Sequence, residues 1–125
     1  MIDRYVAIQA ILRTVEANDL VLSTTGMISR EVFVTNDRPA NFYMIGSLGL
    51  VSSLGLGLAL LRPSRRVYVL EGDASALMSL GALALIAAEG PENLVHVILD
   101  NEAYESTGSQ PSTSSHVSLA EIASA

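Results

Sequence analysis

The sequence predicts a doubly wound α/β domain, in which a mostly parallel β-sheet carries helices on both faces. Short apolar, β-branched runs alternate along the chain with longer segments of helical periodicity. The run LVHVIL, residues 94–99, has few polar positions, as expected for a strand covered on both faces. The length of 125 residues is that of one domain, so we expect a single domain over residues 1–125.

The individual elements follow from periodicity and from the residues that interrupt it. Helices are expected where apolar residues recur every three to four positions, and strands where short apolar runs lie between turn residues. The expected elements, in order, are a helix over residues 3–17, a strand over 20–24, a helix over 27–34, a strand over 42–45, a helix over 47–61, a strand over 66–70, a helix over 75–89, a strand over 94–99 and, after a polar loop over 105–118, a last helix.

Residues that start or stop helices set the boundaries of these elements. Asp3 is placed to cap the first helix, and Gly26 permits a tight turn before the second. Pro63 ends the third helix, and Gly90 closes the fourth. Ser118 begins a capping-box pattern, which predicts the start of the last helix.

The charge content narrows the classes of function. The net charge is −6 and lysines and arginines do not cluster, which argues against a non-specific nucleic-acid binder. Only 16% of the residues are charged, and so little polar surface predicts burial against another chain in an oligomer. The absence of cysteine excludes disulfides and thiolate metal sites, and it fits a cytoplasmic protein.

An uncharged stretch over residues 39–61 raises the alternative of a membrane-spanning helix. It is long enough to cross a bilayer, and its glycines and serines are spaced as in membrane helix interfaces. Gly46 and Ser47 instead indicate a helix start inside the stretch, and a soluble α/β pattern follows it. We therefore expect no membrane association.

Two further features receive a structural interpretation. The glycines of GSLGLVSSLGLGLAL do not form a dinucleotide-binding fingerprint after a strong first strand, so they are expected to allow close helix packing. His96 alternates within an apolar strand, and we expect it to be a sheet-face residue with a satisfied hydrogen bond.

Polar residues follow two strands that are neighbours in the sequence. Asp73 comes after the strand over 66–70, and Asn101 comes after the strand over 94–99. Ligands of open α/β sheets bind beyond the carboxyl ends of the strands. Carboxylate and amide oxygens suit Mg²⁺, and backbone amides that open a helix after Asp73 can meet a diphosphate. The alternative is that Asp73 only caps the helix.

The segments around these residues resemble one enzyme family. They are TTGMISREVF, FYMIGSLGLVSSLGLGLAL, RRVYVLEGDASALMSLGALALIA and NLVHVILDNEAYESTGSQPS. The pattern GD, a helix, a strand and then N resembles the GDG…NN motif of thiamine diphosphate enzymes. Over about residues 20–113 the chain is similar to the diphosphate-binding domain of the sulfopyruvate and phosphonopyruvate decarboxylases.

The resemblance implies thiamine diphosphate and Mg²⁺ as cofactors. Asp73, Asn101 and the carbonyl of Ala103 match the metal ligands. Leu48 matches the bulky apolar residue that bends the cofactor, and Glu102 lies on the thiazolium side; both count as catalytic positions. The cofactor-binding positions that the resemblance implies are Gly46, Ser47, Leu48, Gly72, Asp73, Ala74, Ser75, Asn101, Ala103 and Tyr104.

Three departures from the family pattern stand out. Ala74 replaces the second glycine of GDG, which costs about 1 kcal/mol if that position needs a positive φ. Asp100 replaces the first asparagine of NN. The family domain continues beyond the point where this sequence stops, so we expect a chain truncated at its C-terminus.

The resemblance also implies a partner and a reaction. Enzymes of this kind use a glutamate on a pyrimidine-binding domain, which we do not find here. The expected assembly is a beta-type subunit with a pyrimidine-binding alpha subunit or domain that supplies the glutamate, and the methionine just before the first helix favours separate subunits. The expected reaction converts sulfopyruvate or phosphonopyruvate into an aldehyde and CO₂, with thiazolium as the electron sink. Two alternatives stay open: a degenerate or truncated domain with only an association role, and an acetolactate-synthase-like carboligase.

Overall fold

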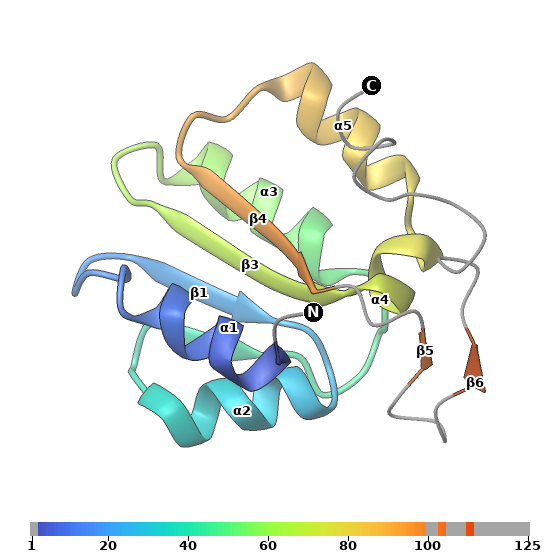
Figure 1. The fold of residues 1–125 in the computed structure, drawn as a ribbon. Coiled ribbons are helices and arrows are strands. Elements are labelled where there is room, and N and C mark those ends of the chain that lie inside the picture. Colours follow the sequence, from blue (N-terminus) through green and yellow to red (C-terminus); the bar gives the residue numbers. More distant parts are fainter. Residues whose placement is uncertain (1–2, 100–102, 105–109, 112–125) are drawn as a thin grey trace.

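A four-stranded parallel sheet forms the centre of the molecule, with strand order β2-β1-β3-β4 (Figure 1). The computed structural model describes residues 3–99, 103–104 and 110–111. The strands are β1 (Leu20–Ser23), β2 (Asn41–Tyr43), β3 (Val67–Gly72) and β4 (Leu94–Leu99). A separate antiparallel pair consists of β5 (Ala103–Tyr104) and β6 (Gln110–Pro111), so part of the expected polar loop is extended.

Helices cover both faces of this sheet, which confirms the doubly wound α/β class (Figure 1). Helices α1 and α2 lie on one face, and α3 lies on the other with α5 beside it. The helices are α1 (Arg4–Leu12), α2 (Met27–Asn36), α3 (Val51–Leu61), α4 (Asp73–Met78) and α5 (Gly81–Glu89).

The core consists of two apolar layers that β3 separates. Alternate side chains of β3 point to opposite faces, so Tyr68 and Leu70 pack under α1 and α2 while Val67 and Val69 pack under α3. The first layer also contains Ile8, Leu12, Val21, Ile28 and Val32, and the second contains Leu22, Val51 and Ala59. Coverage of both faces is therefore found at β3, whereas every described residue of β4 is only partly buried.

Gly55 lets α3 approach the sheet closely. A Cβ atom at Gly55 would lie 2.2 Å from Cγ2 of Val69 on β3. Gly57, on the same helix, has no atom within 4 Å of the equivalent position. The packing interpretation of the glycine-rich segment is thus confirmed at Gly55 and does not extend to Gly57.

The first helix begins as expected and ends early. The carboxylate of Asp3 accepts a hydrogen bond from the amide of Tyr5 at 2.7 Å, which confirms the predicted cap. Helix α1 ends at Leu12 rather than at residue 17, because Thr14 makes both main-chain and side-chain hydrogen bonds to the carbonyl of Ile11. These bonds close a tighter turn than the α-helix allows.

The prediction of a helix from residue 47 is wrong by four positions. Helix α3 begins at Val51, since Ser47 and Gly49 have φ angles of 58° and 98°, which a right-handed helix excludes. In the described part of the chain, no helix is long and apolar enough to cross a bilayer. The stretch over 39–61 instead holds β2, a loop and the 11-residue α3.

The segment after β3 also differs from the expectation. Strand β3 continues through Glu71 to Gly72, and the single helix predicted over 75–89 is two helices, α4 and α5. The break lies at Ser79, whose φ and ψ of −136° and 54° leave the helical region. Gly90 closes α5 in the left-handed conformation, as expected. The helix expected after residue 118 lies outside the described residues.

Candidate functional site

The carboxyl ends of β3 and β4 lie next to each other. Gly72 is paired in register with Leu99, so the segments that follow the two strands leave the sheet at the same edge. Strand β1 ends at this edge too, where the amide of Thr24 donates to the carbonyl of Leu70 at 2.9 Å. Figure 1 shows α4 at this edge of the sheet. This is the edge at which ligands of open α/β sheets bind.

Asp73 is a buried carboxylate at this edge, with 1% of its surface exposed. It is the first residue of α4, whereas the N-cap position belongs to Gly72, in extended conformation. Asp73 is therefore not the cap of the helix, and the interpretation of Asp73 as only a cap is wrong.

Ala74 lies inside α4, in right-handed helical conformation. Ser47 is the only non-glycine residue with a positive φ in the ranges that the structure describes. The alanine at this position of the motif therefore carries no penalty from a left-handed backbone. Its small side chain is buried, with 8% of its surface exposed.

The loop between β2 and α3 packs against α4 and so reaches the same edge. Gly49 has a φ of 98°, and a Cβ there would lie 3.0 Å from Cβ of Met78 and 3.3 Å from the carbonyl oxygen of Ser75. The preceding residues are the cofactor candidates Gly46 and Ser47, which are exposed, and Leu48, which is partly buried. Ser47 holds a strained positive φ, a feature that concentrates at functional sites.

Close to Asp73 in the sequence, Glu71 and Ser75 belong to a chain of hydrogen bonds that joins β3, β4, α4 and the residue after β1. Thr24 Oγ1 donates to Ser75 Oγ at 3.2 Å, and Ser75 Oγ donates to Glu71 Oε2 at 2.6 Å. The other carboxylate oxygen of Glu71 lies 2.5 Å from Nε2 of His96 on β4. Glu71 and Ser75 are each 1% exposed. His96 is a hydrogen-bonded sheet-face residue, as expected.

Glu71 and Thr24 were not among the sequence candidates. A glutamate directly before the GD pair was a usable signal, because acidic residues are rarely buried in a strand without a partner. The histidine in the next strand was the matching signal. Their contact depends on the register of β3 and β4, in which His96 pairs with Val69, two positions before Glu71.

The structure describes the remaining candidates only in part. Ala103 and Tyr104 form β5, which lies beside α4 (Figure 1). Asn101 and Glu102 lie outside the described residues, so their expected roles stay predictions. Within the described ranges, no group of three or more histidine, cysteine, aspartate or glutamate side chains could hold a metal ion. The described part of the chain therefore offers Mg²⁺ at Asp73 no cluster of further carboxylates, and the other oxygen ligands that Mg²⁺ accepts are amide, carbonyl, phosphate and water oxygens.

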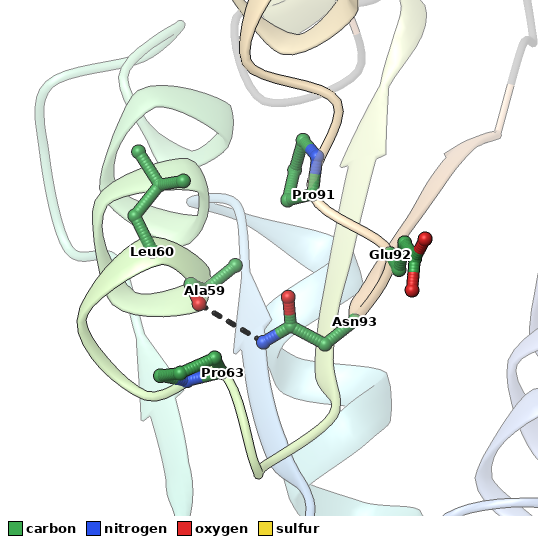
Figure 2. A pocket seen from close by; sticks show the side chains of 6 residues that line it. All are labelled: Ala59, Leu60, Pro63, Pro91, Glu92 and Asn93. Carbon is green, nitrogen blue, oxygen red and sulfur yellow. Dashed lines mark hydrogen bonds between the residues drawn. The ribbon is translucent and has the colours of Figure 1, made fainter.

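A cavity of about 360 Å³ lies at the opposite end of the sheet (Figure 2). It is lined by Ala59, Leu60, Pro63, Pro91, Glu92 and Asn93. The side-chain nitrogen of Asn93, Nδ2, donates to the main-chain carbonyl oxygens of Ala59, Arg62 and Arg65 at 3.0 Å, 3.1 Å and 2.8 Å. These contacts join α3 to the starts of β3 and β4, so this region belongs to the framework and not to the site.

Comparison with known proteins identifies the family to which the chain belongs. The family described as "Thiamine pyrophosphate enzyme, C-terminal TPP binding domain" matches residues 24–123. The chain belongs to the thiamine pyrophosphate enzyme family. The match includes Thr24, the loop before α3, and Asp73, so the residues that follow β1, β2 and β3 at this edge lie within the matched thiamine pyrophosphate-binding domain.

Curated relatives of the chain belong to one branch of decarboxylases. A phosphonopyruvate decarboxylase of Streptomyces hygroscopicus is 48% identical over 98% of this chain and 30% of the relative. A sulfopyruvate decarboxylase subunit beta of Methanothermobacter thermautotrophicus is 46% identical over 98% of this chain and 65% of the relative. A sulfopyruvate decarboxylase of Methanosarcina acetivorans is 50% identical over 74% of this chain and 24% of the relative. The chain thus spans between a quarter and two thirds of these relatives.

Proposed function

We propose that this chain is the diphosphate-binding, beta-type subunit of a thiamine diphosphate-dependent decarboxylase that acts on sulfopyruvate or phosphonopyruvate. The observation that carries the proposal is the buried Asp73 at the end of β3, beside the end of β4, inside the matched thiamine pyrophosphate-binding domain. Relatives with these two substrates in their names, 46% and 48% identical over nearly the whole chain, support this choice of reaction.

The described residues fit a diphosphate held through Mg²⁺. Asp73 offers a hard carboxylate oxygen of the kind that Mg²⁺ takes, and Gly72 leaves the strand end without a side chain. The loop that packs on α4 through Gly49 presents exposed backbone at Gly46 and Ser47. The donor set at this edge is therefore consistent with the cofactor of the family.

Each candidate residue has a proposed role at this edge. Asp73, Asn101 and the carbonyl of Ala103 would hold Mg²⁺. Leu48 would support the bent cofactor, and Glu102 would lie on the thiazolium side. The residues proposed to contact the cofactor are Gly46, Ser47, Leu48, Gly72, Asp73, Ala74, Ser75, Asn101, Ala103 and Tyr104.

Thiamine diphosphate, when bound, supplies the electron sink for the loss of CO₂ from a 2-oxoacid. The residues of this chain orient the diphosphate and the metal and hold them at the edge of the sheet. A pyrimidine-binding alpha subunit or domain supplies the activating glutamate. The beta-subunit names of several relatives support an assembly of this kind.

The alternative of a degenerate domain with only an association role loses one of its arguments. That alternative relied on Ala74 as an unfavourable replacement of glycine, and Ala74 is helical without a positive φ. The carboligase alternative keeps the same cofactor site and differs in the product.

The proposal is tested by turnover with a pyrimidine-binding partner, thiamine diphosphate and Mg²⁺. Sulfopyruvate, phosphonopyruvate and pyruvate are offered separately, and CO₂, aldehyde and acyloin are measured. We expect CO₂ and the matching aldehyde from one of the two anionic substrates. Acyloin from pyruvate would instead support the carboligase. Absence of turnover with every substrate would leave the association role.

A further inference from the structure

Glu71 is a buried carboxylate to which the proposed function gives no role. It lies on β3 with 1% of its surface exposed, two residues before Asp73. Its oxygens contact Ser75 on α4 and His96 on β4, at 2.6 Å and 2.5 Å. A buried carboxylate is costly unless it is paired and hydrogen-bonded, so this residue needs an explanation beyond packing.

The hydroxyl of Ser75 is committed to this chain of contacts. Serine has a single hydroxyl proton, and Ser75 donates it to Glu71 Oε2. Ser75 Oγ in turn accepts a hydrogen bond from Thr24 Oγ1. The side chain of Ser75 therefore faces the protein, and the main chain of this turn is the part that can face a diphosphate.

His96 holds Glu71 from the neighbouring strand. The contact of Nε2 with Oε1 is a hydrogen bond from His96 to Glu71 in the tautomer of His96 that is protonated at Nε2. Both side chains lie on the α3 face of the sheet, since they alternate with residues of the α1 and α2 layer. Glu71 thus links α4 and β4, and Ser75 extends the link to Thr24 after β1.

Helix α4 needs such support. It has only six residues, and no side chain caps its start at Gly72. Isolated helices shorter than about 12–15 residues are marginal in water, so the position of α4 depends on its tertiary contacts. Among the described residues, the tertiary contacts of α4 include the hydrogen bonds of Ser75 and the packing of Gly49 against Met78.

We propose that Glu71 is a positioning residue for the cofactor site. This inference rests on the proposed function. By holding the Ser75 hydroxyl and being held by His96, Glu71 fixes the first turn of α4, with Asp73, against strands β1, β3 and β4. Replacing Glu71 alone leaves Ser75 and His96 without this partner, so some loss of stability is expected. The effect that distinguishes a positioning role is a loss of cofactor affinity that a destabilising change elsewhere in the fold does not produce.

The test measures the Kd of thiamine diphosphate with Mg²⁺ and the Tm of the same samples, in the full-length protein with its pyrimidine-binding partner. Glu71→Met removes both contacts of Glu71 at similar volume. Ser75→Ala removes the contacts with Glu71 and Thr24 and keeps the contact between Glu71 and His96. We expect Kd to rise about tenfold in each, the size of one lost charge-assisted hydrogen bond. The double variant should bind little worse than Glu71→Met alone, because both changes break one chain of contacts.

Two controls separate positioning from general loss of stability. In Glu71→Gln the side-chain carbonyl oxygen can still accept a hydrogen bond from Ser75. The side-chain NH₂ group can donate to Nε2 of His96 when His96 is in the tautomer that is protonated at Nδ1. We therefore expect a Kd for thiamine diphosphate within about threefold of wild type. Asn93→Ala removes partly buried hydrogen bonds at the far end of the sheet, and it should lower Tm without changing Kd.

The outcomes separate a failure of the proposed function from a failure of the positioning role of Glu71. A wild-type protein that binds no thiamine diphosphate would overturn the proposed function and this inference with it. Wild-type binding that Glu71→Met and Ser75→Ala leave within twofold would overturn the positioning role alone. A Kd that rises in Asn93→Ala as much as in Ser75→Ala would show a purely structural effect and overturn it as well. Where Glu71→Met does not fold, Ser75→Ala still tests the link between Glu71 and α4, because the Ser75 hydroxyl donates to Glu71 and only the main chain of Ser75 is left to face the cofactor.

Discussion

Gly72, at the end of β3, pairs in register with Leu99, at the end of β4. The chain continues from Gly72 directly into Asp73 and α4, and β5 lies beside α4 after the short segment that follows Leu99. Two stretches that the sequence separates by a helix and a strand therefore meet at one edge of the sheet. The proposed Mg²⁺ and diphosphate site depends on this meeting.

Gly49→Ala should destabilise the protein by about 2–4 kcal/mol, from a left-handed backbone and a steric clash. The φ of Gly49 is 98°, and the new Cβ would lie 3.0 Å from Cβ of Met78 and from Oγ of Ser79. Urea unfolding of the cofactor-free protein measures the change. Gly46→Ala, in the same loop with no atom within 4 Å, is the matched control and should stay within about 0.5 kcal/mol. Equal effects of the two variants would contradict the described contact of the loop with α4.

Gly55→Ala and Gly57→Ala should shift stability in opposite directions. At Gly55 the added methyl would lie 2.2 Å from Cγ2 of Val69, and overpacking of this kind costs about 1–3 kcal/mol. At Gly57 there is no atom within 4 Å, so alanine should stabilise the helix by about 0.5–1 kcal/mol. Thermal or urea unfolding gives the sign. A stabilising Gly55→Ala would show that α3 lies farther from β3 than described.

Asn93→Ala should cost about 0.5–1.5 kcal/mol in the free energy of unfolding, because it removes partly buried hydrogen bonds that join α3 to the starts of β3 and β4. Its amide nitrogen contacts the carbonyls of Ala59, Arg62 and Arg65. The neighbouring Glu92→Ala, at an exposed residue, serves as the control and should be near neutral. The affinity for thiamine diphosphate should be unchanged in both variants, and a tenfold loss in Asn93→Ala would contradict a framework role for this end of the sheet.

The alternation of strands and helices could be predicted from the sequence, because it depends on the local pattern of apolar and polar residues. The apolar runs at residues 20–24, 66–70 and 94–99 are strands in the structure, with ends that move by one or two residues. The start of α3 could not be predicted, because Ser47 has a positive φ in a loop that packs on α4 through Gly49. Serine has no sequence signal for that conformation.

The candidate site was predictable in part for the same reason. Asp73 follows a strand and precedes a helix, which local pattern can indicate. The strand that the sequence predicts ends at residue 70, before Glu71, and the sequence does not assign Glu71 a partner on β4. The contact between Glu71 and His96 exists only through the register of two strands that an entire crossover separates.

The central claim is that Asp73 anchors the cofactor through Mg²⁺. Calorimetric titration of thiamine diphosphate, with Mg²⁺ and again with EDTA, tests this claim most directly. It compares the wild-type protein with Asp73→Asn, and with Asp37→Asn, an exposed carboxylate after α2, as the matched control. We predict binding that needs Mg²⁺, that falls by at least about 100-fold in Asp73→Asn, and that is unchanged in Asp37→Asn. Wild-type binding that persists in EDTA, or an Asp73→Asn protein that folds and binds as tightly as wild type, would contradict the assignment of Asp73 as the metal anchor.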